Sequence, residues 1–565
     1  MSRRPDNGMH PPAGGHNHSP PQPQPAGHLH PDQGLVRPRI TISHLPNELL
    51  IKIFSDFGSA EYLLPVMAVC QAWRNVVRGA PEFWCHIYVD RRLEWLAECL
   101  ERSQPLEVQV TFRSPATDVP QALDVLRLHK DRITSLVFRP LHCAQIAEDR
   151  MVLEDLPRLE TVQVFVDHTH NHAAGPTECM HEICPALILS SLGLQRLNVH
   201  GMMVIQGHPA ALSSLRELKI GGCIAARKGP RLALFIGILN ACISLEKLAL
   251  YSGSLDVVRF DLPQNVGPRV TLPRLCELTI SGKVEQVSNL LSHMEVRDNV
   301  NLWVETDDQE DIDRAAVAPR AILPNDIPAC AVDILKSATR ILVDVPTGWS
   351  QEVAFVTATR GMNRDHKINI VVRVSQERCL AEDGTASLKA QRVYFVNALT
   401  YLPAMFPNAP VETIVCRAAL DAVDEETWRS LFSRLPMLRM LVISNHFCGD
   451  LRPLFRALMS PQSSDDQCPV CRHLEYIWVR NASGTFDRLA EVRKCILWRT
   501  ARNAPLSRLR LELTALMQAV PPNPAGYRAE FARLVHESDL VIVPGIFNET
   551  DETFRGVLEE FPFDS

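Results

Sequence analysis

The chain has 565 residues, enough for two or three domains. Hydrophobic residues make up 46% of it, charged residues 22%, and the net charge of -7 is small for this length. A broad basic surface for nucleic acid is therefore not expected. The sequence shows neither a stretch of about 20 apolar residues that could span a membrane nor a secretory signal. We expect a cytoplasmic or nuclear protein with reduced cysteines and no cofactor.

Residues 1–39 are rich in proline, glycine, histidine and glutamine and contain almost no large apolar side chains. Such a segment cannot bury enough apolar surface to offset the entropy lost on ordering. We therefore predict a disordered arm. Its histidines would allow loose metal binding, but a solvated arm is the favoured interpretation. These histidines are His10, His16, His18, His28 and His30.

Residues 40–90 are predicted to form a small helical unit. Leu45, Leu49, Ile53 and Phe57 recur every four residues, as on one face of a helix, and Pro46 stands where a helix start accepts proline. A second apolar stretch follows and ends at glycine and proline. So small a unit cannot hide all of these apolar groups in its own core, so part of them should face a partner.

After this unit the sequence repeats a short phrase, apolar-x-x-apolar-x-apolar. Its last two apolar residues are two apart and face one side of a short strand, while the first turns in from the preceding loop. The residues between phrases, such as 231–241, fit a return helix with an apolar face. The clear copies are Leu159-Val162-Val164, Leu194-Leu197-Val199, Leu215-Leu218-Ile220, Leu245-Leu248-Leu250, Leu275-Leu278-Ile280, Leu438-Leu441-Ile443, Leu474-Ile477-Val479 and Leu506-Leu509-Leu511. Weaker copies are Ile133-Leu136-Phe138, Asn299-Leu302-Val304, Ala338-Ile341-Val343 and Val411-Ile414-Cys416.

One strand–helix unit of this kind cannot bury its apolar face alone, but a stack of such units can. We therefore predict an α/β chain in which residues 91–540 form an irregular leucine-rich-repeat-like solenoid, with parallel strands inside and helices outside. Copies are spaced by roughly 20 to 45 residues, wider than in regular leucine-rich repeats. Residues 353–374 fit the phrase poorly. Residues 541–565 are predicted to be an acidic tail.

Three blocks within residues 40–90 together resemble the F-box motif. The first is Leu45-Pro46-Asn47-Glu48-Leu49, the second Val69-Cys70-Gln71-Ala72-Trp73-Arg74, and the third Phe83-Trp84. The first block alone would be a weak match, but three blocks in the expected order are specific. The arrangement, with leucine repeats after the motif, is similar to the large F-box families of fungi. The connection over residues 56–61 departs from the usual pattern.

The resemblance implies that this segment binds the Skp-type adaptor of a Skp–cullin–F-box ubiquitin ligase, and through it the cullin. Apolar groups clustered on a small helical unit also suit helix-in-groove association. The alternative is that some of these side chains only hold the three helices together. The residues carried over as adaptor-binding are Leu45, Pro46, Leu49, Ile53, Val69, Cys70 and Trp73, with Trp84 closing the unit.

Residues that alternate with the buried ones in each phrase are predicted to line the open inner face of the solenoid. Early copies place modest side chains there, such as Glu217 and Lys219, whereas late copies place large ones. Tyrosine, tryptophan and arginine dominate binding energy at interfaces, and an arginine row suits an acidic or phosphorylated peptide. The alternative is that loops cover the aromatics and water solvates the arginines. The hypothesised substrate-binding residues are Tyr476, Trp478, Arg480, Arg508 and Arg510.

Two stretches contain residue types that bind metals. Cys468 and Cys471 have the spacing of a thiol pair, but no second pair follows at a defined spacing, and only His473, His446 and Cys448 lie near in sequence. The other stretch is a predicted loop, where histidines without fixed spacing usually face water. We predict no metal site at either. The loop residues are His168, His170, His172, Cys179, His181 and Cys184.

The sequence contains no phosphate-binding glycine loop and no hydrolase or metalloprotease motif. We therefore predict a non-catalytic substrate-recognition adaptor, which docks through residues 40–90 and captures an unidentified protein substrate on the repeat domain, without nucleic-acid or membrane partners. An F-box scaffold that acts outside ubiquitination is the alternative. A hydrolase or metalloenzyme that uses the histidine-rich loop or the thiol pair is a remote third.

Overall fold

The computed structural model describes most of the chain between residues 42 and 544. The predicted arm over residues 1–39, the histidine-rich stretch 168–184 and residues 545–565 lie outside the described residues. The described residues are 42, 45–90, 92–113, 118–142, 150–153, 156–167, 186–189, 191–201, 203–207, 209–221, 231–251, 258, 267–297, 300–308, 335–344, 352–359, 367–374, 385–406, 408–418, 422–461, 468–483, 486–515 and 524–544.

The N-terminal unit consists of three short helices, α1 (Asn47–Ser55), α2 (Ala60–Val69) and α3 (Gln71–Gly79), followed by the 3-10 turn η2 (Pro81–Trp84). Helix α3 is capped by Cys70, whose Sγ accepts a hydrogen bond from the backbone N–H of Trp73 at 3.5 Å. Helices α1 and α2 turn their buried side chains toward the interior of the unit. The helical unit predicted from the sequence is confirmed.

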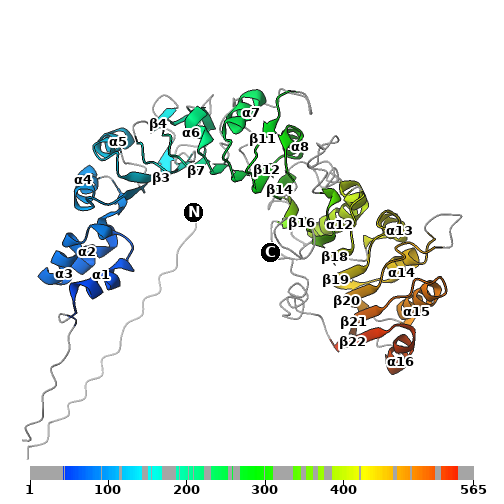
Figure 1. The fold of residues 1–565 in the computed structure, drawn as a ribbon. Coiled ribbons are helices and arrows are strands. Elements are labelled where there is room, and N and C mark those ends of the chain that lie inside the picture. Colours follow the sequence, from blue (N-terminus) through cyan, green and yellow to red (C-terminus); the bar gives the residue numbers. More distant parts are fainter. Residues whose placement is uncertain are drawn as a thin grey trace, which may run out of the picture.

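A sheet of seventeen strands follows the helical unit. Every repeated phrase predicted from the sequence ends on a strand of this sheet. The last two apolar residues of each phrase are buried on the same face of that strand. Figure 1 shows the strands along the inner side of an open arc. In spatial order they are β1 (His86–Val89), β2 (Val108–Phe112), β3 (Ile133–His142), β5 (Thr161–Asp167), β7 (Arg196–His200), β9 (Glu217–Gly221), β10 (Lys247–Leu250), β12 (Glu277–Gly282), β14 (Asn301–Asp308), β17 (Lys367–Val374), β16 (Glu352–Thr359), β15 (Arg340–Asp344), β18 (Thr413–Ala418), β19 (Met440–Gly449), β20 (Tyr476–Ser483), β21 (Arg508–Ala515) and β22 (Glu537–Pro544).

The stretch that fitted the phrase poorly forms an exception within this sheet. Strand β16 runs antiparallel to both of its neighbours, β15 and β17, whereas all the other described pairs of the large sheet are parallel. Strands β15, β16 and β17 stand between β14 and β18 in the reverse of their chain order, and α12 (Thr385–Met405) leads from β17 to β18. The expectation of parallel strands throughout is therefore wrong at β16.

Helices cover most of the outer side of the arc (Figure 1), as in the return helix α7 (Leu232–Ala241) that was predicted over residues 231–241. Between β3 and β9, however, a second sheet lies on this side, made of β4 (Arg150–Leu153), β6 (Ala186–Leu189) and β8 (Met203–Gly207), all parallel. The expectation that only helices lie outside is therefore corrected. The other elements on this side are α4 (Leu93–Arg102), α5 (Val119–Arg127), α6 (Pro209–Ser213), α8 (Val284–Ser292), α13 (Glu425–Arg434), α14 (Arg452–Leu458), α15 (Phe486–Thr500), α16 (Pro524–Leu534), and the short pair β11 (Val270–Thr271) and β13 (Met294–Glu295).

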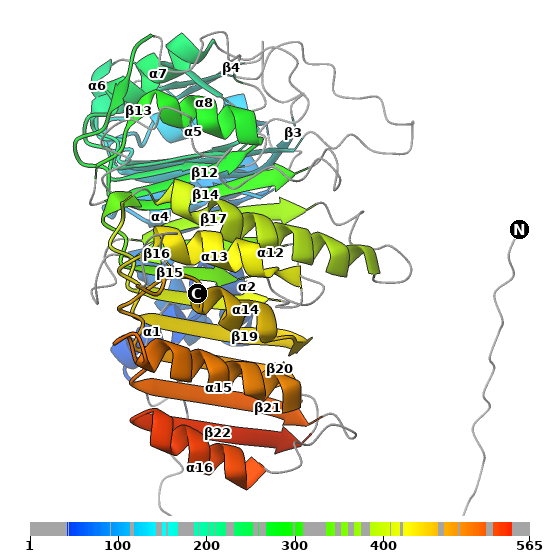
Figure 2. The same ribbon diagram turned by 90° about the vertical axis from the view of Figure 1, so that its right-hand side faces the viewer.

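Most of the buried apolar side chains form one continuous cluster that begins at Leu50 in α1 and reaches Leu540 in β22. It lies between the sheet and the outer layer, where α13, α14, α15 and α16 follow one another over β19 to β22 (Figure 2). Strand β22 continues through Pro544, so the tail boundary expected at 540/541 falls inside this strand. Within the described residues, no helix combines the length and apolarity that crossing a membrane requires.

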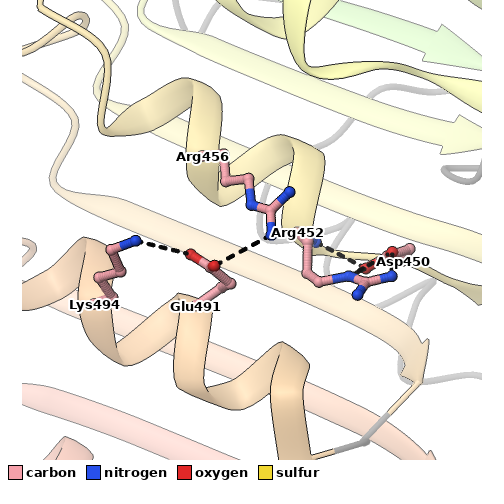
Figure 3. A network of polar contacts seen from close by, with 5 residues as sticks. All are labelled: Asp450, Arg452, Arg456, Glu491 and Lys494. Atoms are coloured by element: carbon pink, nitrogen blue, oxygen red, sulfur yellow. Dashed lines mark hydrogen bonds and ion pairs between the residues drawn. The ribbon is translucent and has the colours of Figure 1, made fainter.

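Adjacent outer helices are also joined by polar contacts, as Figure 3 shows for α14 and α15. Arg456 on α14 reaches Glu491 on α15 with 3.3 Å between Nη2 and Oε1, and Lys494 lies 4.0 Å from the other carboxylate oxygen. At the start of α14, Arg452 bonds Asp450 at 2.6 Å. These groups are partly exposed, so each pair adds at most about 1 kcal/mol, and the apolar cluster carries the stability.

A buried arginine on α15 holds the loop that precedes β20. Arg499 donates hydrogen bonds to the carbonyl oxygens of Val470 at 3.1 Å and of Cys471 at 3.0 Å, and its side chain is fully buried. Burial lowers the pKa of its guanidinium below the usual value. Because the loop carbonyls lie away from water, the arginine serves as their internal donor.

We predict that Arg499→Met lowers the free energy of unfolding by about 2–4 kcal/mol, because two buried carbonyl groups lose their donor. Urea-induced unfolding of the purified chain, followed by far-UV circular dichroism, measures this loss. The matched control is Arg493→Ala on the same helix, which removes an exposed ion pair with Glu530 and is expected to cost less than about 1 kcal/mol. Equal losses for the two variants would contradict the structural role of Arg499.

Candidate functional site

Helix α1 has two apolar faces, although a helix at the surface of a small domain usually has one. Leu50 and Phe54 point into the core, whereas Leu49 and Ile53 remain 47% and 45% exposed. Leu49 and Ile53 are four residues apart and therefore lie on the same side of the helix. Phe57 continues their spacing beyond the helix end and is exposed as well. This row is the apolar surface that the sequence predicted for a partner.

The junction between α2 and α3 adds further exposed apolar groups. Val69, the last residue of α2, is 62% exposed, and the thiol of Cys70 beside it is exposed too. Trp73 on α3 is half-buried, because its ring packs edge-on against Phe54 with 5.1 Å between the ring centroids. Leu45 is likewise half-buried, and Pro46 is exposed. Seven of the eight predicted adaptor-binding residues therefore have surface that a partner can contact. They are Leu45, Pro46, Leu49, Ile53, Val69, Cys70 and Trp73.

Trp84 is the one predicted adaptor-binding residue that the structure takes away from the surface. It is only 1% exposed, and its indole N–H donates to the carbonyl oxygen of Val77 at 2.9 Å. Its ring lies 5.7 Å from that of Trp95 on α4, and the guanidinium of Arg102 covers it at 4.9 Å. In this structure Trp84 therefore has no surface for a direct contact with an adaptor, and it closes the helical unit from within. The residue joins the helical unit to the first outer helix of the sheet.

A second contact between the helical unit and the sheet is built around Arg113, directly after β2. Its guanidinium carbon lies 3.4 Å from the ring centroid of Tyr88 on β1. The same group donates to the hydroxyl of Tyr62 at 3.3 Å and pairs with Glu61 at 3.2 Å, both on α2. The helical unit is thus attached to the sheet by the buried tryptophan and by this surface cluster, and the two parts share one core.

The comparison with known families agrees with this geometry. The F-box-like family model matches residues 42–90, which contain α1, α2, α3, η2 and β1, so the chain contains an F-box-like domain there. F-box domains generally bind Skp-type adaptors. No curated protein matches the chain.

The substrate-binding residues predicted late in the chain lie on the inner face of β20 and β21, but they differ in accessibility. Trp478 is 5% exposed and forms a small apolar cluster with Val415, Met440 and Val442 on the inner face. Its indole N–H donates to Glu512 at 3.2 Å. Arg480 is buried too and pairs with the same glutamate at 3.2 Å. Neither side chain offers a free surface, which fits the alternative in which neighbours cover the aromatic group.

The other three predicted residues meet along a hollow of about 460 Å³ between β20, β21 and β22. Tyr476 is half-buried there, and Arg508 is exposed. Arg508 pairs with Glu537 at 2.7 Å, and Arg510 pairs with Glu512 at 2.9 Å. These carboxylates neutralise the arginines, so the row is less suited to an acidic or phosphorylated peptide than the sequence implied.

The structure reveals a row of side chains on the inner face that was missed in the sequence. Arg139, Phe165, His200 and Tyr251 each come directly after the last apolar residue of a repeated phrase and stack on one another across neighbouring strands. Late in the chain Arg480, which directly follows the phrase Leu474-Ile477-Val479, was predicted at this position, but no such residue was predicted after the earlier phrases. The residue type at the position after each phrase was the signal that could have identified the row. This position faces inward like the alternate residues inside the phrase.

Cys471, one of the cysteine pair near residue 470, is placed as a core residue. The Cys471 thiol is buried and donates to the carbonyl oxygens of Phe432 and Leu435 at 3.2 and 3.3 Å. Burial raises its pKa to about 12, which disfavours the thiolate that zinc requires. Cys468 is exposed. Within the part of the chain that the structure describes, no group of three or more His, Cys, Asp or Glu residues is placed to hold a metal ion.

We predict that Trp84→Ala lowers the free energy of unfolding by about 3–5 kcal/mol, because it empties a buried site between α3 and α4. Trp84→Phe, which keeps a ring there, should cost less. Thermal unfolding measures both effects. Adaptor binding by the folded fraction of Trp84→Phe should match that of the unchanged chain, and a selective loss of adaptor affinity without loss of stability would restore Trp84 to the binding surface.

Proposed function

We propose that this chain is the substrate-recognition adaptor of a Skp–cullin–F-box ubiquitin ligase, acting in the cytoplasm or nucleus. The observation that carries the proposal is the exposed apolar row Leu49, Ile53 and Phe57 on a helical unit that matches the F-box-like family model. Apolar groups at this spacing suit a helix that docks into the groove of another protein. The partners would be a Skp-type adaptor and, through it, a cullin.

In this proposal, residues 91–544 are an irregular leucine-rich-repeat-like solenoid that captures a protein substrate. Support comes from the succession of parallel strands, which pair mostly in chain order, and from the repeated phrases on them. Each unit buries its apolar face only against its neighbours, which is the physical basis of such repeats. The inner face of the arc in Figure 1 would receive the substrate. Tyr476, Arg508 and Arg510 remain a proposed contact surface at its far end.

A receptor of this kind needs no catalytic group of its own, because it acts by raising the local concentration of substrate near the activated ubiquitin. The shared core between the F-box-like domain and the sheet suits this task, since it fixes the distance between the docking surface and the substrate. The proposal therefore assigns the chain a positioning role, and the partner enzymes supply the chemistry.

We predict that the double substitution Leu49→Ala and Ile53→Ala weakens binding of a Skp-type adaptor by at least about 10-fold, because exposed apolar anchors are removed while the core residues Leu50 and Phe54 stay. Isothermal titration calorimetry with purified adaptor measures the affinity. The matched control is Leu128→Ala, which truncates an exposed leucine outside the F-box-like domain. Unchanged adaptor affinity in the double variant, with its fold intact, would contradict the docking proposal.

The ligase role is tested in cells by comparing the full chain with the double variant of Leu49 and Ile53, which keeps the shared core intact. We expect the full chain to recover cullin together with the adaptor, and the double variant to accumulate a bound protein that the full chain turns over. Proximity labelling with the double variant identifies that protein. Recovery of adaptor without cullin, and no protein whose level responds, would favour the alternative of an F-box scaffold outside ubiquitination.

A further inference from the structure

The row that was missed in the sequence crosses five neighbouring strands of the inner face. The strand register places Phe165 beside His200 and His200 beside Gly221, and Arg139 and Tyr251 extend the row at its two ends. The guanidinium carbon of Arg139 lies 4.4 Å from the ring centroid of Phe165. The ring centroids of Phe165 and His200 are 4.8 Å apart, and those of His200 and Tyr251 are 5.7 Å apart. We call these four side chains the stacked row.

Gly221 allows the row to cross β9. A Cβ atom at this position would lie 1.9 Å from Nδ1 of His200, so any other residue would displace the imidazole. The imidazole therefore lies over the glycine backbone and reaches Tyr251 on the far side. Burial, together with the nearby charge of Arg139, lowers the pKa of His200, so the ring is neutral at pH 7 and stacks as an uncharged group.

Arg139 differs in its surroundings from the arginines late in the chain. It is exposed, lies over the ring of Phe165, and donates one hydrogen bond to Oε1 of Gln163 at 2.9 Å. No carboxylate of the described residues pairs with it, in contrast to Arg480, Arg508 and Arg510. A guanidinium placed over a ring, with one hydrogen bond made, keeps its remaining N–H groups for an acceptor, and a carboxylate can accept two of them.

A polar hollow of about 430 Å³ adjoins the row on the inner face of β2 to β9. Gln163, the hydrogen-bond partner of Arg139, lines it. So does Glu160, whose side chain is exposed and has no cation bonded to it among the described residues. Asn198 places a buried side-chain oxygen in the wall without a described hydrogen-bond donor. The hollow thus presents an unpaired carboxylate, an unused acceptor and, at the row, an unpaired cation.

We propose that the stacked row and the adjoining hollow bind an extended peptide segment of the substrate that carries a basic side chain for Glu160 and an acidic side chain for Arg139. This inference rests on the proposed role as a substrate receptor. Glu160 directly precedes β5 and Gln163 lies three residues further along the chain, which corresponds to about 10 Å of extended backbone. The basic and acidic side chains of the peptide should therefore be three or four residues apart.

The charges favour an unmodified carboxylate over a phosphorylated side chain. A single unpaired guanidinium balances one negative charge, whereas a phosphate carries close to two. In the adjoining hollow, Glu107 and Glu217 pair with Arg158 and Lys219, so the carboxylate left to repel the excess charge is that of Glu160. The peptide backbone would supply N–H donors for the unused oxygen of Asn198.

The test is selection from a display library of random nonapeptides on the immobilised full chain. We expect the unchanged chain to enrich peptides with a basic residue followed or preceded, three or four positions away, by an acidic one. Arg139→Glu should enrich a basic residue in place of the acidic one, and Arg139→Gln should weaken a selected peptide by at least about 10-fold. A charge reversal that leaves the enriched sequences unchanged, or no enrichment by the unchanged chain, would overturn the proposal.

Gly221→Ala tests the stacked row without changing any charge. Displacement of the imidazole should lower the affinity for the same peptide by about 3- to 10-fold, which corresponds to the loss of one aromatic contact. The matched control is Gly237→Ala in α7, where an added Cβ meets no atom within 4 Å, and binding should not change. Thermal unfolding confirms that each variant is folded. Equal affinity of both glycine variants would exclude a role for the row.

Three further readouts separate the rival occupants and the parent proposal. Selective binding of phosphorylated peptides would assign the surface to another occupant and overturn the inference. So would a dimer seen by light scattering that dissociates in the Arg139→Glu variant. Adaptor affinity, measured on the same samples, reports on the F-box-like domain alone. We expect Arg139→Glu to keep it, and the double variant of Leu49 and Ile53 to lose it while peptide selection persists.

Discussion

The burial of Trp84 between the helical unit and the first outer helix is the interaction on which the rest of the molecule depends. It links α3, through the carbonyl of Val77, with Trp95 and Arg102 of α4. Domains that move relative to one another usually have separate cores joined by a linker. Here one apolar cluster runs from α1 to β22, so a displacement of the helical unit would open that cluster to water. The exposed apolar row on α1 and the inner face of the sheet consequently keep a fixed relation.

The inner face of the sheet is governed by how charges pair between strands. Neighbouring strands are about 4.8 Å apart, so an arginine or lysine easily reaches an acidic residue on the next strand. Lys247 with Glu277 and Arg508 with Glu537 follow this rule, and Arg439 with Glu475 does so directly before β19 and β20. A charged side chain that is already paired contributes little to ligand binding, because the ligand would have to break the existing ion pair. Arg139 escapes the rule because its neighbours are Phe165 and Gln163.

Much of the fold could be predicted because the repeated phrase has the period of a strand and recurs with return segments between its copies. The copies ended on strands even where they were weak, as at Val343 and Cys416, since burial of alternate residues is a local property. The antiparallel β16 and the outer sheet of β4, β6 and β8 could not be predicted in this way. Their placement depends on which strands meet, and a short apolar run does not specify its neighbour.

The candidate sites also differ in how far the sequence alone predicted them. The spacing of Leu49, Ile53 and Phe57 by itself identified an apolar face too large for a small helical unit, because helix periodicity places these residues on one side. Only the tertiary structure decided which large side chains remain accessible. It buried Trp84 and Trp478 and left Arg139 open, although tryptophan and arginine are both common at interfaces. The physical reason is that burial and charge pairing arise between residues distant in the chain, which the sequence order does not bring together.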